Sequence, residues 1–416
     1  MDKIKTYLKI LLLNSEQQDF RILISILLRY CAFVVCIPRS IYLLLKNVQL
    51  QKKIIIQYIP YAGHSSELTN GIVDSENIVV LVDNNAKKLN FTHSAIYFPG
   101  DFFWVRWIIK YSVVKFFDFD IVMQSNSSAV PIFYNFFRYF DKDYFSQTTV
   151  DSTIDREIFY KISKYAKTFQ TPNITKSEAI KILKNNEYII LKAIDTQGSR
   201  GVYKINNIKD FNTILENSAK KVFIYERNII GKQYHFNALV CNGKADVYEV
   251  TREYFNVPVL GKEIIPYLTI YNHNYLDTHL NYLDEIHSEI AEITEMNYGV
   301  IDLEIIINNG IFYVIDFAAR VGADWPFVQD MASNENFSDH YVSSLKNKKY
   351  KRNINSNNKS IFRMHPKFKS NLFYIDMVNE LEFCMNKYGY DYYYVDYDKA
   401  NYWIDKIDNY VCLHNV

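Results

Sequence analysis

This chain of 416 residues has almost no net charge and few glycines. Lysine and arginine number 47 and aspartate and glutamate 46, so the net charge is only +1. Without an overall positive field we expect no nucleic-acid partner. Only 12 glycines are present, and no G-x-G-x-x-G pattern follows any expected strand. The sequence therefore gives no support for dinucleotide binding.

Cysteine is also sparse, and its spacing excludes a common redox motif. The five cysteines are odd in number and include no C-x-x-C pair. A disulfide framework would need pairs, so the pattern indicates a reduced, intracellular environment. We expect a cytoplasmic protein. The cysteines are Cys31, Cys36, Cys241, Cys384 and Cys412.

No uninterrupted apolar run is long enough to span a membrane. Residues 22–45 are strongly apolar, but Arg29, Pro38 and Arg39 interrupt them, and a span needs about 18 such residues. No small-residue cleavage site follows, so a secretory signal is not expected. Flanking lysines would suit peripheral membrane contact through residues 22–45. The sequence favours instead a helical extension over residues 1–50, packed on the protein or on a partner subunit, and a homodimer is allowed.

The length allows two or three domains, and the first shows alternating strands and helices. This alternation over residues 51–150 predicts a Rossmann-like domain with a mostly parallel sheet. Strands are expected at 53–59, 78–83, 94–99 and 120–125, and helices at 102–117 and 131–140.

The pattern changes after residue 150. We expect two helices around Thr171-Pro172, strands at 187–194 and 222–227, and a hairpin turned at Asn242-Gly243. A helix over 275–297 then leads into a second hairpin. These elements predict a second domain over 151–340, and 341–416 is a strand–helix mixture that completes it. The fold class is α/β (α+β).

Lys192 lies near the end of an apolar strand, where its ammonium needs solvent or an anion. The loop 195–201 follows and supplies backbone N–H groups, a hydroxyl and a guanidinium, which could cradle phosphates. It is not a Walker A loop, since no G-K-[ST] follows. Taken alone, a glycine loop between strands is most often only a turn. The candidate phosphate ligands are Gln197, Gly198, Ser199, Arg200 and Gly201.

A second candidate binding element follows the strand that ends near Glu226. A carboxylate beside exposed main-chain groups, here near Ile229, can bind the edge of an adenine ring. Gln233 could reach ribose hydroxyls. The alternative is an ordinary charged strand end, which would be the better interpretation if this were the only signal.

The hairpin over 299–324 carries carboxylates on an apolar background. A three-residue connection, 309–311, would place Glu304 directly opposite Asp316. Like charges so placed destabilise a sheet, and a hard cation bridging them would explain the arrangement. A two-residue Asn309-Gly310 loop would instead pair Glu304 with Ile315 and leave a solvated polar face. The hairpin alone does not decide between a metal site and a solvated polar face.

Arg320 follows Asp316 by four residues and adds a rigid fork of donors beside the proposed metal. Such a group can neutralise charge on a transferring phosphoryl group. Other polar residues near these elements are expected to be structural rather than catalytic: His64, His93, His235, Arg252 and Asp324.

The order of these motifs resembles the ATP-grasp superfamily, in its carbamoyl-phosphate-synthase-like and amino-acid-ligase branches. The segment IDREIFYKISKYAKTFQTP is similar to that family's first helix, with Arg156 where a phosphate-binding Lys is usual. YIILKAIDTQGSRGV resembles its Lys strand and glycine loop, and IYERNIIGKQYHF its hinge. GVIDLEIII and YVIDFAARVGAD resemble its two metal-binding strands.

The resemblance implies a two-subdomain ATP-grasp fold that binds ATP and Mg²⁺. Lys192, Arg156 and the glycine loop would hold phosphates, and Glu304 and Asp316 the metal. Asp316 is shorter than the family's usual Glu, and Ala318 replaces an Asn that commonly supplies a third metal oxygen.

The implied activity is an ATP-dependent carboxylate–amine ligase that joins small-molecule carboxylate and amine substrates through an acyl phosphate. In such an enzyme Lys192 and Arg320 would act on the reacting groups. Alternatives on the same scaffold are a small-molecule kinase and a catalytically weak nucleotide-binding module. Together the Lys192 strand, the glycine loop and the Glu226 hinge favour the Mg-ATP interpretation of the hairpin.

Overall fold

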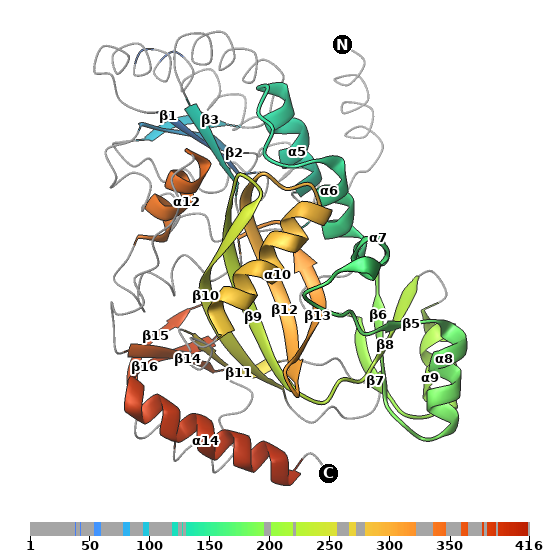
Figure 1. Ribbon diagram of the computed structural model, residues 1–416. Coiled ribbons are helices and arrows are strands. Elements are labelled where there is room, and N and C mark those ends of the chain that lie inside the picture. The colour runs from blue at the N-terminus through green and yellow to red at the C-terminus, as the bar shows by residue number, and fades with distance from the viewer. Residues whose placement is uncertain are drawn as a thin grey trace, which may run out of the picture. The chain divides into compact units, whose positions relative to one another are not determined.

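The computed structural model describes most of the chain beyond residue 118 and separate strands before it (Figure 1). By contacts, the chain divides into two compact units, Met1–Gln124 and Ser125–Val416. The described ranges are 54–59, 78–83, 95–99, 119–123, 130–194, 201–218, 222–255, 266–271, 279–321, 336–346, 359–364, 381–387 and 390–414, with a few single residues.

The first unit contains a four-stranded sheet in the order β3-β2-β1-β4. All three strand pairs are parallel, which requires crossover connections. The four expected strands are confirmed. The helix expected over 102–117 lies outside the described residues, so the complete Rossmann-like domain stays a prediction. The strands are β1 (Ile54–Ile59), β2 (Ile78–Asp83), β3 (Ala95–Pro99) and β4 (Phe119–Met123).

The second unit begins with α5 (Val130–Tyr139) and α6 (Gln147–Ile154). Helix α5 was expected over 131–140. It buries Phe133, Phe136 and Phe137, whose spacing places them on one helical face. Because α5 groups with the second unit, residues beyond 124 that the sequence assigned to the first domain lie there too. The domain boundaries expected from the sequence stay predictions.

A small antiparallel sheet in the order β5-β8-β6-β7 lies between residues 173 and 227. Two helices cover one of its faces, and their core includes Leu183, Leu191 and Phe211. Since side chains alternate along a strand, Lys192 points away from that core. The elements are β5 (Asn173–Ile174), α8 (Lys176–Lys184), β6 (Ile189–Ala193), β7 (Val202–Ile205), α9 (Ile208–Asn217) and β8 (Phe223–Arg227).

The large sheet has eight strands in the order β13-β12-β9-β10-β11-β14-β16-β15. Helix α10 (Leu280–Ile293) packs on one face, where His287 meets Phe236 edge to face. The C-terminal strands continue this sheet, and α14 (Tyr397–His414) covers them with a core around Trp403. The strands are β9 (Lys232–Cys241), β10 (Lys244–Phe255), β11 (Pro266–Tyr271), β12 (Tyr298–Asn308), β13 (Ile311–Ala318), β14 (Lys359–Met364), β15 (Glu382–Lys387) and β16 (Tyr390–Asp396).

The remaining helices are short or lie at the sheet's margin. Before the small sheet, α7 (Arg156–Ile162) continues into the 3₁₀ turn η3 (Ser163–Tyr165). Helix α12 (Phe337–Leu345) contacts β12 and β9. No helix within the described ranges is long and apolar enough to cross a membrane, and the apolar residues 22–45 fall almost entirely outside them.

The β12–β13 hairpin combines the two pairings left open by the sequence. Its turn is the two-residue Asn309-Gly310 loop, with both φ angles positive (49° and 76°), so the three-residue connection was wrong. Glu304 nevertheless pairs with Asp316, as the metal-site interpretation required. A β-bulge between Glu304 and Ile305 makes both true, because it leaves Ile315 as an extra residue on β13.

Candidate nucleotide and metal site

Lys192 and Glu226 lie on neighbouring strands of the small sheet, on the face away from its helices. The Lys192 Nζ atom lies 3.0 Å from Glu226 Oε1. The two residues are only 6% and 2% exposed. A charge so deeply buried is costly unless it is paired, so each side chain gives the other the partner that its burial requires.

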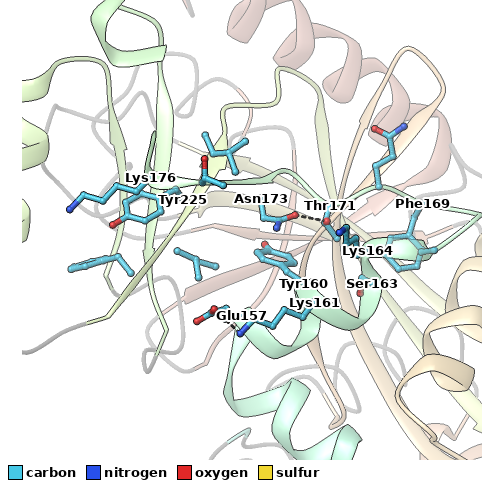
Figure 2. A pocket seen from close by; sticks show the side chains of 16 residues that line it. Glu157, Tyr160, Lys161, Ser163, Lys164, Phe169, Thr171, Asn173, Lys176 and Tyr225 are labelled. Carbon is cyan, nitrogen blue, oxygen red and sulfur yellow. Dashed lines mark hydrogen bonds and ion pairs between the residues drawn. The ribbon is translucent and has the colours of Figure 1, made fainter. Parts of the chain in front are cut away.

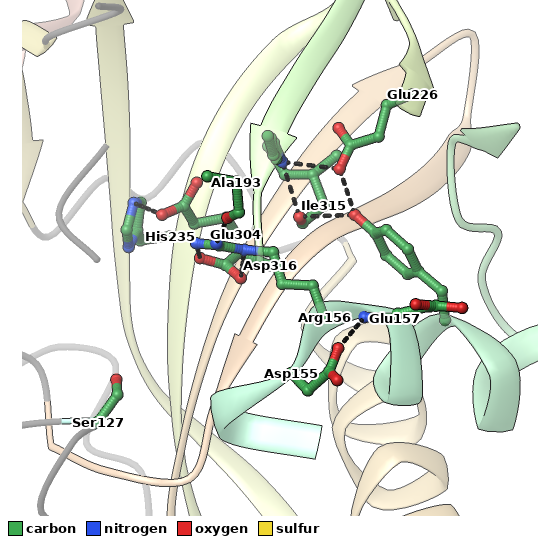
Figure 3. A network of polar contacts seen from close by, with 12 residues as sticks. Ser127, Asp155, Arg156, Glu157, Ala193, Glu226, His235, Glu304, Ile315 and Asp316 are labelled. Atoms are coloured by element: carbon green, nitrogen blue, oxygen red, sulfur yellow. Dashed lines mark hydrogen bonds and ion pairs between the residues drawn. The ribbon is translucent and has the colours of Figure 1, made fainter. Parts of the chain in front are cut away.

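Two further groups complete this contact, as Figure 3 shows. The main-chain oxygen of Ile315, the bulge residue, accepts from Lys192 Nζ at 2.9 Å. The Tyr160 hydroxyl, on α7, lies 3.0 Å from the same oxygen and also hydrogen-bonds to Glu226 Oε1. Burial and the neighbouring Glu226 carboxylate raise the pKa of Tyr160 well above its usual value. Tyr160 is therefore a neutral donor.

Arg156 joins the carboxylate pair to the Lys192 strand. It is the first residue of α7, whose N-terminus Asp155 caps by accepting from the Glu157 N–H. Its guanidinium donates in a fork to Asp316, with Nε–Oδ1 2.8 Å and Nη2–Oδ2 3.0 Å, and its Nη1 donates to the Ala193 oxygen at 3.1 Å. Burial alone would raise the pKa of Asp316, but Arg156 outweighs it and the pKa is lowered.

Glu304 lies opposite Asp316 and close to His235. Burial first, and then the Asp316 and Glu253 carboxylates, raise the pKa of Glu304 to about 7, although His235 and Lys192 oppose them. Glu304 Oε2 accepts from Gln233 Nε2 at 3.2 Å. The predicted ribose-binding residue therefore contacts a predicted metal ligand.

His235 is part of the site, although the sequence indicated a structural role. Its Nε2 lies 3.1 Å from Glu253 and 3.4 Å from Glu304, and its Nδ1 lies 3.5 Å from Asp302. Burial would lower the pKa of His235, but these carboxylates raise it well above the usual value. The signal was available, because His235 follows Gln233 by two residues and therefore shares its face of β9.

Arg320 forms an ion pair with Asp302 of the same hairpin, and its Nε donates to Ser127 Oγ at 3.1 Å. Burial would raise the pKa of Asp302, but Arg320 and His235 lower it. Arg156 thus neutralises the charge of Asp316, and Arg320 neutralises that of Asp302.

The structure describes only some of the other predicted residues. Gln197, Gly198, Ser199 and Arg200 lie outside the described residues. Gly201 has a positive φ of 71° and its oxygen accepts from the Ala193 N–H at 2.9 Å, which closes the base of the loop. Ile229 is partly exposed between β8 and β9. Arg252 pairs with Asp408 of α14. Because side chains alternate along β10, Arg252 faces the side opposite to its neighbour Glu253, which contacts His235.

An open cavity of about 680 Å³ has Tyr160 among its lining residues (Figure 2). It is lined by residues of α7, the 166–171 segment, β5 and β8, among them Lys161, Asn173 and Tyr225. Among the described residues, none of the predicted phosphate or metal ligands lines it. This cavity is therefore not the predicted nucleotide site.

The part of the chain that the structure describes holds no group of three or more His, Cys, Asp or Glu side chains arranged to bind a metal ion. Ala318 lies opposite Asp302 and contributes no oxygen. Glu304 and Asp316 remain as two hard oxygen donors at facing positions of the hairpin. Mg²⁺ is commonly held by one or two carboxylates together with substrate phosphates. The pair suits a cation shared with a phosphate, not a closed protein cage.

Comparison with known families explains this layout. Residues 156–324 match the model of the ATP-grasp domain. This segment is an ATP-grasp domain. It contains Arg156, Lys192, Glu226 and the hairpin carboxylates. The family and the two-subdomain fold expected from the sequence are thereby confirmed.

Solved structures of ATP-grasp enzymes share the fold of most of the chain. An L-amino acid ligase from Bacillus licheniformis has a TM-score of 0.62 at 13% identity, covering 86% of this chain and 97% of its own. The N5-carboxyaminoimidazole synthetase from Staphylococcus aureus, complexed with ADP, has a TM-score of 0.59 at 13% identity, with coverages of 86% and 96%. Phosphoribosylglycinamide synthetase from Anaerococcus prevotii has a TM-score of 0.54 at 14% identity, with coverages of 86% and 97%. No curated protein matches the sequence.

Proposed function

We propose that this ATP-grasp protein is an ATP-dependent carboxylate–amine ligase, which forms an amide or peptide-like bond through an acyl phosphate. The observation that carries the proposal is the double contact of Arg156. One cationic side chain joins Asp316 of the carboxylate pair to Ala193, the neighbour of Lys192. The groups predicted to bind phosphate and metal therefore lie close together.

In this proposal Glu226 and the main chain near Ile229 hold the adenine, and Gln233 the ribose. The third N–H of Lys192 and the Arg156 guanidinium contact the phosphates, which suits their pre-set positions. The glycine-loop residues Gln197, Gly198, Ser199, Arg200 and Gly201 would supply further phosphate contacts.

Glu304 and Asp316 would hold Mg²⁺ together with the nucleotide phosphates. The bound ion would neutralise the charge of those phosphates. Arg156 donates to both oxygens of Asp316. To bind the ion there, Arg156 would have to give up one of these two hydrogen bonds or share an Asp316 oxygen with the ion. Gln233 keeps Glu304 oriented toward the same place.

The proposed reaction begins when a substrate carboxylate attacks the γ-phosphate of ATP, giving an acyl phosphate and ADP. An amine then displaces phosphate, and the amide forms. Arg320, held by Asp302 and Ser127, stabilises negative charge that develops on the reacting acyl group. Support for a ligase comes from the L-amino acid ligase and phosphoribosylglycinamide synthetase that share the fold.

The test is release of ADP and phosphate from Mg-ATP in the presence of a panel of carboxylates and amines. Lys192→Ala and Asp316→Ala should abolish that release, because each removes a group that must contact the phosphates or the metal. Lys181→Ala, on the exposed side of α8, is the matched control and should keep full activity. Turnover that survives both site substitutions would refute the ligase. Phosphate transferred to an acceptor and retained there would indicate a kinase instead.

A second candidate is a nucleotide-binding module with weak or no catalysis. Two observations favour it: Arg156 occupies both oxygens of Asp316, and Ala318 supplies none. ATP that raises the melting temperature without any turnover across the panel would identify this function. Cytoplasmic location and homodimer formation are parts of the proposal that size-exclusion chromatography and cell fractionation can test.

A further inference from the structure

Tyr160 and Lys192 share the same two acceptors, although they come from different parts of the fold. Each contacts Glu226 Oε1 and the main-chain oxygen of Ile315. The four groups form a closed ring of contacts between α7, the small sheet and the bulge of β13 (Figure 3). Neither the fold comparison nor the motif resemblance assigns a role to Tyr160.

The proton count shows how the ring is arranged. A tyrosine has one O–H to donate, whereas a lysine ammonium has three N–H groups. A hydrogen bond to a carboxylate is stronger than one to a neutral carbonyl. The Tyr160 proton therefore goes to Glu226, and Lys192 supplies the bond to the Ile315 oxygen. This arrangement uses two N–H groups of Lys192 and leaves its third, together with Glu226 Oε2, for a ligand.

We propose that Tyr160 is a positioning residue, which fixes the Lys192–Glu226 pair so that both can contact one nucleotide. The proposal rests on the proposed function, because it assigns to Tyr160 a role in the same site. Tyr160 would act only through Glu226 and Lys192, and would not touch the reacting atoms. The alternative is that its ring simply fills the core beside Phe159.

Tyr160→Phe separates these roles, since the phenylalanine ring keeps the packing and loses only the hydroxyl. Without that donor, Glu226 retains Lys192 as its charged partner, and the pair is free to draw together and away from the ligand. We expect the dissociation constant for ATP, measured by isothermal titration calorimetry, to rise roughly tenfold, as expected for the loss of one hydrogen bond to a charged group.

The matched control is Tyr203→Phe. Tyr203 lies on β7, on the face of the small sheet that packs against the helices, where it contacts Phe223. It therefore tests the loss of a hydroxyl from the same sheet without touching the pair. We expect wild-type affinity from this variant.

A double-mutant cycle with Glu226→Gln tests whether Tyr160 acts through Glu226. If it does, Tyr160→Phe should weaken ATP binding less than threefold in the Glu226→Gln background, because the charged acceptor is already gone. Equal effects in both backgrounds would show a merely structural residue and overturn the proposal. So would wild-type affinity in Tyr160→Phe itself.

The remaining outcomes are also decisive. Replacing Tyr160 by p-aminophenylalanine keeps a donor on the ring and should restore affinity to within threefold of wild type. If Tyr160→Phe does not fold, this second substitution still tests the donor, and weak binding by the folded protein would refute the proposal. Wild-type protein that binds no ATP would refute the proposed function, whereas ATP binding that ignores position 160 would refute only the positioning role.

Discussion

The main-chain oxygen of Ile315 lies 2.9 Å from Lys192 Nζ because Ile315 is the extra residue of a β-bulge. In a regular ladder that oxygen would be directed at the neighbouring strand. The bulge thus has two effects in one place. It lets Glu304 face Asp316 despite the two-residue turn, and it turns a carbonyl toward the lysine of the small sheet.

Deletion of Ile315 separates these two effects. Without the extra residue, Asp316 moves to the position that a regular ladder places opposite Glu304, so the carboxylate pair is kept. The carbonyl that orients Lys192 is lost. We expect a folded protein of reduced stability, because a buried side chain is removed, with at least a tenfold weaker affinity for ATP. Circular dichroism measures the stability, and calorimetry measures the ATP affinity. Unchanged ATP affinity would show that the carbonyl does not position Lys192.

Gly231 connects the Glu226 hinge to β9, and space rather than backbone conformation requires a glycine there. A Cβ at this position would lie 2.4 Å from the Ile307 oxygen and 2.7 Å from Ile306 Cγ2. Gly231→Ala must therefore push β9 from β12, and overpacking of this kind costs about 1–3 kcal/mol. We expect lower stability in urea together with weaker ATP binding, because Gln233 moves with the strand.

Gly310 provides the contrast for that experiment. A Cβ there would meet nothing within 4 Å, but its φ is 76°. Gly310→Ala should lose only the left-handed conformational preference, about 1–2 kcal/mol, and leave ATP affinity unchanged. If Gly231→Ala and Gly310→Ala affected ATP binding equally, the displacement of β9 would be wrong as an explanation.

The strands and the carboxylate pair could be predicted from the sequence because alternation reports burial on one face. Glu304 and Asp316 stand out from apolar neighbours, and their pairing is confirmed. The bulge could not be predicted. A residue inserted into a strand leaves the apolar pattern on either side intact. The two-residue Asn309-Gly310 turn and the pairing of Glu304 with Asp316 therefore looked mutually exclusive.

Contacts between elements that are distant in the sequence could not be predicted either. Arg156 was assigned to phosphate, but its guanidinium binds Asp316, which lies 160 positions away in sequence. Tyr160 reads as an ordinary core aromatic, since nothing local reveals that its hydroxyl meets Glu226. Such contacts depend on how α7 packs against two sheets, and this packing has no local sequence signature.

His287 should make the protein less stable in mild acid. It is fully buried on α10, and burial lowers its pKa, although its hydrogen bonds to the backbone oppose this effect. The folded state therefore favours the neutral ring, whereas the unfolded chain takes up a proton below a pH of about 6.5. Stability is full above that pH and is lost as the pH falls toward the lowered pKa of the folded state.

The measurement is the free energy of unfolding in urea at pH 7.5 and 5.5. Wild-type protein should lose up to about 1.4 kcal/mol more than His287→Leu over this interval, since one proton is linked to unfolding. His279→Leu, at the exposed start of α10, controls for the removal of a histidine from the same helix. A wild-type loss no larger than that of His287→Leu would contradict the prediction.

Helix α14 is fixed to the large sheet by a buried ion pair, and its energetics can be tested with two substitutions. Asp408 accepts from both terminal nitrogens of Arg252, which is 4% exposed and lies between the rings of Tyr234 and Tyr254. Asp408→Ala leaves that guanidinium buried without its carboxylate, which should cost up to about 3 kcal/mol, less than for a fully buried pair because Asp408 is partly exposed.

The double variant Arg252→Met, Asp408→Ala removes both charges and keeps an apolar side chain between the two tyrosine rings. Because the desolvation cost of Arg252 disappears with its charge, this protein should be more stable in urea than Asp408→Ala alone. Asp405→Ala, at an exposed position of α14, should remain close to wild type. If the double variant were less stable than Asp408→Ala, the prediction would be wrong, because the interaction of Arg252 with Tyr234 and Tyr254 would then exceed the cost of burying its charge.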